Sequence, residues 1–368
     1  MANNPTFDQF LRPKAVPSYS AEETTYASSV GYQTKTIELP KVVNFSDGQQ
    51  MAARGADIAT AYKEAGVDVL PVYVNPASSS HQIISETDGI LVRNRHTEHA
   101  VDELMFASTS EDSGMVWQVT AEYTEFGEGI PDNKRPNHTA AEAAELPTKS
   151  DRKHKHQSAS AVLQEPGRKR KRLPSGKDEK KDEPWISGRV DMLHCLGRKG
   201  TRPRLNKGHP STTTRPIVCV ESKRHGMLQR AKTKLVLWSQ GPVKDWIYQV
   251  GGEECGAITG PVDPGTMRLL QQCGFYAMVY RTQFVELQDP FESILVQFTG
   301  VKIRSDVTAS ELWREGLGKE MELTVLTGTE VQPGTLAFRY LARLNTPLDD
   351  AQKAGMSVEE GSKEKNEA

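Results

Sequence analysis

Apolar side chains recur at helical intervals in several stretches of the chain. Asp47 can cap one such stretch and Gly66 can end it, which predicts a helix between them. Residues 96–108 return to helical spacing, and residues 265–282 carry the most regular pattern of this kind. Shorter helical patterns cover residues 227–240 and 306–318. We therefore expect helices to be distributed over much of the chain.

Short runs of β-branched, aromatic and other apolar residues predict strands between these helices. Such runs cover residues 67–74, 115–126, 185–196, 216–224, 284–288, 293–303 and 321–328. The sequence DPFE at 289–292 is a turn signal between two of the runs, so that pair should form a β-hairpin. Strands and helices are thus expected to alternate along the sequence.

Three stretches show neither pattern. The first forty or so residues are rich in Pro, Ser, Thr and Tyr, which predicts an irregular segment without a chemical role. Residues 131–183 are mainly Lys, Arg, Glu, Ser and Pro and hold few large apolar groups. Such a composition cannot bury enough apolar surface to offset the entropy lost on ordering. We expect this insert, and the polar tail from about Pro347, to be disordered.

A dense basic cluster lies within the insert, in the sequence GRKRKRLPSGK at 167–177. Its core is Arg168, Lys169, Arg170, Lys171 and Arg172. Three interpretations fit such a cluster: recognition by a nuclear import receptor, contact with nucleic-acid phosphates, or a solvated charged linker. We favour nuclear import. The net charge of the chain is −2, so affinity for a polyanion has to come from the local distribution of charge.

Several classes of protein are disfavoured by motifs that the chain lacks. No stretch approaches the roughly eighteen consecutive apolar residues of a membrane span, and the N-terminus lacks the order of a secretory signal. We expect an intracellular protein that is nuclear through its basic cluster and does not bind a membrane. Neither GxxxxGK[ST] nor GxGxxG occurs, which disfavours nucleotide hydrolysis. The four cysteines and nine histidines, including His194 and His225, show no metal-ligand spacing, so we expect ordinary thiols and structural or solvent-facing imidazoles.

Charged residues end two of the predicted strands. Glu221 and Lys223 are separated by one residue, so the period-two alternation of a strand sends both to one face and Ser222 to the other. Asp191 ends another apolar run, and if the two strands pair antiparallel, its carboxylate and that of Glu221 can converge on one ion. Two carboxylates suit a hard cation, and a nearby lysine can position water or neutralise charge at a phosphate. The competing interpretation is a surface strand whose charges face solvent.

Three blocks in this order resemble the PD-(D/E)XK nuclease superfamily, and within it the RecB-like exonucleases. The sequence GRVD at 188–191 resembles that branch's G-x-[VI]-D, and ESK at 221–223 resembles its D/E-x-K after an apolar strand. The sequence QCGFY at 272–276 fits its Q-x-x-x-Y on a helix. A nuclease-like core among low-complexity insertions is also similar to the layout of fungal proteins that carry this domain.

The resemblance implies an α/β (α+β) fold with a central mixed β-sheet flanked by helices, a restriction-endonuclease-like core that here contains a disordered basic insert. It implies that Asp191 and Glu221 bind Mg²⁺ or Mn²⁺ and that Lys223 lies beside the scissile phosphate. Gln272 and Tyr276 would face the active site, where they contact DNA or order the catalytic groups.

The family pattern also has an acidic residue on a helix before the first strand, often near a histidine. Glu103 fits this position, with His99 four residues earlier in the chain. Glu98 and Glu122 are the alternatives.

These expectations divide the chain into segments: a partly irregular N-terminal region 1–84, a nuclease-like core 85–132 and 184–305, a disordered insert 133–183, a C-terminal helix-strand extension 306–346 and a disordered tail 347–368. The expected activity is metal-dependent hydrolysis of DNA. Phosphate contacts are expected from Arg198, Lys199, Arg224 and Arg230. The alternative is an inactive nuclease-fold module that binds nucleic acid or a protein partner.

Overall fold

The structure is a computed structural model of the 368-residue chain. It describes residues 4–14, 20–21, 34, 37–40, 42–72, 82–83, 86–107, 115–125, 186–197, 214–229, 231, 264–303 and 309–346. The expected disordered insert and tail lie outside these residues, as does most of the helix expected at 227–240. Within the described part, no helix is both long and apolar enough to cross a membrane.

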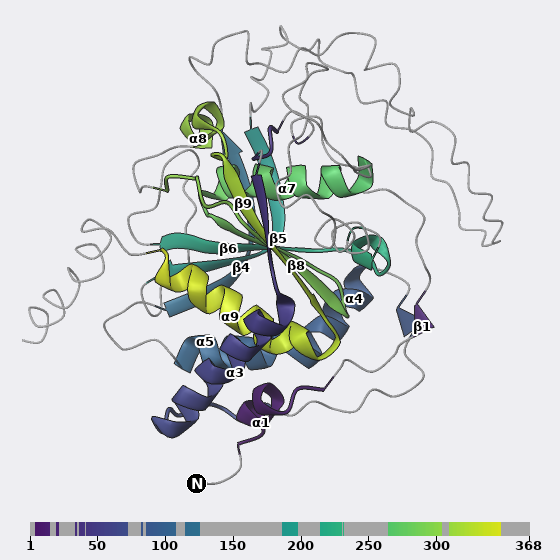
Figure 1. Ribbon diagram of the computed structural model, residues 1–368, viewed down its shortest axis with the longest axis vertical. Helices are drawn as coiled ribbons and strands as arrows, with labels where there is room; N and C mark the ends of the chain where they lie inside the picture. Colours follow the sequence, from purple (N-terminus) through teal and green to yellow (C-terminus); the bar gives the residue numbers. More distant parts are fainter. Residues whose placement is uncertain are drawn as a thin grey trace, which may run out of the picture.

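A seven-stranded mixed sheet forms the centre of the molecule (Figure 1). In spatial order its strands are β2 (Val42–Ser46), β9 (Glu320–Thr327), β8 (Glu292–Gln297), β7 (Phe284–Gln288), β6 (Thr214–Ser222), β5 (Ile186–Gly197) and β4 (Met115–Glu125). The pairs β2–β9 and β6–β7 are parallel, and the other four neighbouring pairs are antiparallel. The expected mixed sheet and the β7–β8 hairpin are therefore confirmed. A separate short pair joins β1 (Ser20–Ala21) to β3 (Gln82–Ile83).

Helices cover both faces of this sheet (Figure 1). One face carries α7 (Pro264–Tyr280) and α8 (Ala309–Glu315). The other carries α3 (Gly48–Glu64), α5 (His99–Ala107) and α9 (Val331–Leu344). The remaining helical segments are α1 (Pro5–Leu11), α4 (Glu86–Arg93), the π-helical turn η1 (Asn94–Glu98) and the 3₁₀ turn η3 (Gly328–Glu330). The helices expected at 47–66, 96–108, 265–282 and 306–318 correspond to α3, α5, α7 and α8.

The N-terminal segment is more ordered than its composition indicates. Residues 5–11 form α1, which Asn4 caps by accepting a hydrogen bond from the backbone of Thr6. Residues 67–72 belong to no strand, contrary to the extended interpretation of this run. Their backbone is held instead by polar side chains of the first segment: the Asn4 amide donates to the carbonyl of Val69 at 2.6 Å, and the Thr6 hydroxyl donates to the next carbonyl at 2.7 Å. Tertiary hydrogen bonds order both segments.

The helix α9 is the main element that the sequence patterns do not predict. Its first turn contains Pro333 and Gly334, two residues that usually end or interrupt helices, so the segment after β9 looks like a turn. Proline is nevertheless tolerated in a first turn, where its missing N–H would have no partner within the helix. A capping box formed by Thr327 and Glu330 precedes it and ends β9.

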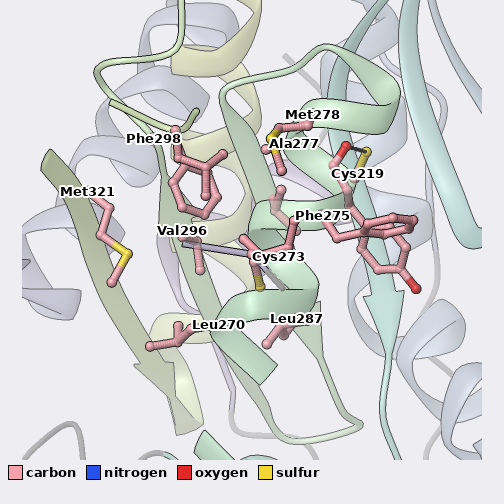
Figure 2. Close-up of a cluster of buried hydrophobic side chains, with 14 of the residues drawn as sticks. Cys219, Leu270, Cys273, Phe275, Ala277, Met278, Leu287, Val296, Phe298 and Met321 are labelled. Carbon is pink, nitrogen blue, oxygen red and sulfur yellow. Dashed lines mark hydrogen bonds between the residues drawn. The ribbon is translucent and has the colours of Figure 1, made fainter. Parts of the chain in front are cut away.

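Each face of the sheet has its own hydrophobic core. In the α7-side core, α7 packs Leu270, Cys273 and Ala277 among side chains from the strands, including Leu287 and Val296 (Figure 2). The α9-side core joins α1, α3, α5 and α9 to alternate residues of the same strands. The sheet between the two cores is thus buried on both faces, and any charged residue on its central strands enters a low-dielectric interior.

Candidate functional site

The end of β6 brings together the three residues that the sequence singles out. The strands β5 and β6 pair antiparallel, and the Oδ2 atom of Asp191 accepts a hydrogen bond from the backbone N–H of Ser222 at 2.8 Å. The Nζ atom of Lys223 lies 2.9 Å from Oε1 of Glu221, on the face toward α7. The hydroxyl of Ser222 accepts from Gln288 at 3.3 Å instead. The expected antiparallel pairing and side-chain alternation are both confirmed.

The helix α7 adds two polar groups to this face. Gln272 accepts a hydrogen bond from Lys223 at 2.9 Å and donates from its amide nitrogen to Glu221 at 3.1 Å and to the Tyr276 hydroxyl at 2.8 Å. A spacing of four residues places Gln272 and Tyr276 on one side of the helix. We call Asp191, Glu221, Lys223, Gln272 and Tyr276 the α7-side group. All the residues of the three sequence blocks that were expected to face one another do so.

This group is buried, so the interpretation of Glu221 and Lys223 as a solvated surface pair is wrong. The side chains of Lys223 and Glu221 are 6% and 12% exposed. Burial raises the pKa of Glu221, the ammonium of Lys223 lowers it, and the carboxylate of Asp191 raises it again, with a net increase. Glu221 thus has one ammonium in contact and a second carboxylate, that of Asp191, close enough to act on it. Such a position favours a cation.

The phenol of Tyr276 remains protonated in this setting. Burial, and then the nearby Glu221 carboxylate, raise its pKa well above the usual range. Its hydroxyl accepts from Gln272 and hydrogen-bonds to Glu221, so it fixes the orientation of both side chains. The tyrosine therefore acts on the arrangement of the carboxylate rather than as an acid or a nucleophile.

The other residues expected to take part lie in different places. Arg224 is exposed beside Lys223. Residues Arg198, Lys199, Arg230 and Arg168 to Arg172 lie outside the described residues.

Glu103, the acidic residue expected on a helix near Asp191 and Glu221, lies elsewhere in the structure. Glu103 lies on α5, which packs on the α9 side of the sheet, and its carboxylate acts electrostatically on Asp102. His99 is exposed. Glu122 is on β4, in register with Arg189, and the conformation of its side chain is not described.

A second set of charged residues is buried under the opposite face of the sheet. Arg93 from α4 contacts Glu98 at 3.1 Å and Glu286 at 2.9 Å. Arg339 from α9 contacts the same two carboxylates, at 2.7 Å and 2.9 Å. Each of the four side chains is at most 1% exposed. We call these four residues the α9-side network. It joins α4, η1, β7 and α9 across the core.

Glu98 also belongs to a group that could hold a metal. Glu98, Asp102 and His194 each offer a ligand atom, and these atoms lie within 4.8 Å of one another. Burial alone would raise the pKa of Glu98, but the guanidinium groups of Arg339 and Arg93 outweigh it and lower the pKa to about 2. Burial raises the pKa of Asp102 to about 7 and lowers that of His194 to about 3. At neutral pH the imidazole is therefore neutral and can act as a ligand.

The sequence patterns missed this second site. His194 was expected to be structural or solvent-facing without metal-ligand spacing, and it instead lies with two carboxylates contributed by a helical segment far away in sequence. The spacing of four residues between Glu98 and Asp102 was a usable signal, since it places both on one side of a helix. The histidine carries no such signal, because the packing of helices on this face of the sheet decides which helix lies against it.

No protein-family model, no curated protein and no solved structure matches the chain.

Proposed function

We propose that the protein is a metal-dependent phosphodiester hydrolase that acts on DNA, with a restriction-endonuclease-like core of the PD-(D/E)XK type. The observation that carries the proposal is the α7-side group: all five residues from the three family-like blocks are linked by hydrogen bonds or direct electrostatic interaction. The mixed sheet flanked by helices agrees with the fold that the resemblance implies.

The residues fit a hard divalent cation such as Mg²⁺ or Mn²⁺. Asp191 and Glu221 would hold the cation through carboxylate oxygens, which are the ligands that such ions prefer. Burial raises the pKa of Glu221 and the nearby Asp191 carboxylate raises it further, and a cation bound by both carboxylates would offset both effects. A bound cation of this kind would lower the pKa of a coordinated water and polarise the phosphate, which would make attack on phosphorus easier.

Other side chains of the protein would bind the phosphate, orient the attacking water and hold the catalytic groups in place. Lys223 holds a proton on Nζ beside Glu221 and can stabilise negative charge on a phosphate oxygen or orient the attacking water. Gln272 fixes both Lys223 and Glu221 from α7, and Tyr276 in turn fixes Gln272. Arg224 is exposed directly beside the site, where it can contact the DNA backbone.

Cleavage of a fluorescent DNA duplex and of the matching single strand tests the proposal, with Mg²⁺, Mn²⁺ or EDTA present. The wild-type chain is expected to cleave only with metal, and Asp191→Asn and Lys223→Met are each expected to reduce the rate by about a hundredfold or more. Asp57→Asn and Lys319→Met change exposed residues of the same types and serve as matched controls. Metal-dependent cleavage that persists in both site variants would overturn the proposal.

A second candidate is a nuclease-fold module that binds nucleic acid or a protein partner without catalysis. One observation favours it: Lys223, Glu221 and Gln272 already satisfy one another through three direct hydrogen bonds. In this case calorimetry should detect no Mg²⁺ or Mn²⁺ binding that Glu221→Gln removes. Binding of labelled DNA without cleavage would then identify the partner as nucleic acid.

A further inference from the structure

His194 presents a buried nitrogen that has no partner. It lies on β5, its side chain is on the α9 face of the sheet with Val218 of β6 beside it in register, and the residue is 1% exposed. Its Nε2 atom has no hydrogen-bond partner among the described residues. A buried acceptor or donor left without a partner is costly, so native proteins usually fill such a position. The adjacent atoms indicate what fills it.

Two carboxylates lie close to the imidazole of His194. One ligand atom each of Glu98 and Asp102 lies within 4.8 Å of a ring nitrogen of His194 and of one another. Glu98 hydrogen-bonds to a guanidinium through each oxygen, but every carboxylate oxygen has two acceptor positions. Asp102 is freer still: Nη1 of Arg339 is 3.8 Å from its Oδ1, beyond hydrogen-bond distance. Both side chains can therefore accept a further partner.

The surrounding charge favours a divalent cation. Arg93 and Arg339 between them contact three carboxylates, those of Glu98, Asp102 and Glu286. The carboxylate of Glu103 also acts electrostatically on Asp102. Carboxylates therefore outnumber guanidinium groups beside His194, and a bound cation would offset this excess.

We propose that Glu98, Asp102 and His194 bind a first-row transition-metal dication of the Zn²⁺ class, separate from the Mg²⁺ site proposed on the other face. A set of one imidazole nitrogen and carboxylate oxygens suits Zn²⁺, Co²⁺ or Mn²⁺, whereas Mg²⁺ prefers oxygen ligands alone. The Asp102 side chain is 17% exposed, so an ion can enter past it. Three protein ligands leave a fourth position for water or another ligand, as in zinc sites that are not purely structural.

The test uses the full-length chain, stripped with chelator and then loaded with Zn²⁺ or with Co²⁺ as a spectroscopic probe. After desalting, elemental analysis is expected to find about one tightly bound ion per chain, and Co²⁺ should give visible bands of a low-coordinate site. Asp102→Asn and His194→Gln should weaken this binding by roughly tenfold or more. Asp102→Asn preserves size at a partly exposed position, so it remains informative if the buried His194→Gln variant fails to fold.

Two control variants separate this site from the others in the chain. His99→Gln removes an exposed imidazole from α5 and should leave the bound ion unchanged. The double variant Asp191→Asn/Glu221→Gln removes the carboxylates of the α7-side group and should retain the Zn²⁺ or Co²⁺ ion, even where DNA cleavage is lost. A wild-type chain that retains no ion, equal retention by Asp102→Asn, or loss of the ion in the controls would overturn the proposal.

Discussion

The polar groups buried on the two faces of the sheet differ in how well positive charges stabilise their carboxylates. In the α9-side network, two guanidinium groups each contact two carboxylates, and the pKa of Glu98 falls to about 2 despite full burial. In the α7-side group, one ammonium contacts Glu221, yet burial and the nearby Asp191 carboxylate raise the pKa of Glu221. The first carboxylate is stabilised in its charged form by its surroundings. The surroundings of the second shift it toward its neutral form.

This difference separates a structural role from a functional one. Buried ion pairs whose charges balance hold elements together, and breaking one leaves an uncompensated charge. A group with excess charge of one sign instead binds something or reacts, and perturbed pKa values cluster at such sites. The α9-side network ties α9 to α4 and β7, so we assign it mainly to the fold. We expect the α7-side group to contribute less to stability.

Replacing the positively charged side chain of each group tests this comparison most directly. Arg339→Met should destabilise the protein by about 3–5 kcal/mol, because Glu98 and Glu286 would lose a buried partner. Lys223→Met should cost only about 1 kcal/mol, because burial and Asp191 already favour the neutral form of Glu221. Urea denaturation at neutral pH in the presence of EDTA measures both free energies of unfolding.

The exposed substitution Lys319→Met provides the baseline for this pair and should change stability by less than about 0.5 kcal/mol. Equal losses for Arg339→Met and Lys223→Met would contradict the division into a structural and a functional group. A large loss for Lys223→Met alone would reverse it.

Replacing glycine by alanine in α3 and in α7 tests how firmly a helix is packed on each face of the sheet. At Gly55 of α3, a Cβ would lie 1.9 Å from the carbonyl oxygen of Pro333, so α3 and α9 would have to separate. At Gly274 of α7, the nearest atoms are side-chain ends, Cδ1 of Leu317 at 2.5 Å and Cγ2 of Ile37 at 2.9 Å, which can rotate. Thermal unfolding should show a loss of about 3 kcal/mol for Gly55→Ala and about 1 kcal/mol for Gly274→Ala. Similar losses would mean that both helices are held equally rigidly.

Alkaline pH should destabilise the α7 side selectively, since the described cysteines all lie in its core. Burial raises the pKa of Cys195 to about 12, whereas an exposed thiol ionises near pH 9. Its contribution to stability is therefore complete below about pH 9 and is lost as pH rises toward 12, at about 1.4 kcal/mol per pH unit. Urea titrations at several pH values should show a shallower decline for Cys195→Ala. An unchanged slope would show that this thiol ionises in the folded protein.

Much of the α7 side follows from local sequence patterns. The apolar runs of β5 and β6 and the regular helical spacing of α7 predict the elements, and a period of two places Glu221 with Lys223. On the α9 side, α3 and α5 follow in the same way, but α9 and the buried ion pairs do not. Pro333 and Gly334 conceal the helix, and the burial of Arg339 contradicts the rule that arginine lies at the surface. Its partners are more than fifty residues away in sequence, and no local pattern encodes such a pairing.

The same distinction holds for the two candidate metal sites. The sequence by itself determined Glu221 and Lys223 as neighbours, because strand alternation is a short-range consequence of backbone geometry. It brought Asp191 to them only on the condition that the two strands pair antiparallel, which the structure shows. Only the tertiary structure decided that His194 meets Glu98 and Asp102. That meeting depends on which helix covers which face of the sheet, and this choice is made by the packing of the whole α9-side core rather than by any one segment.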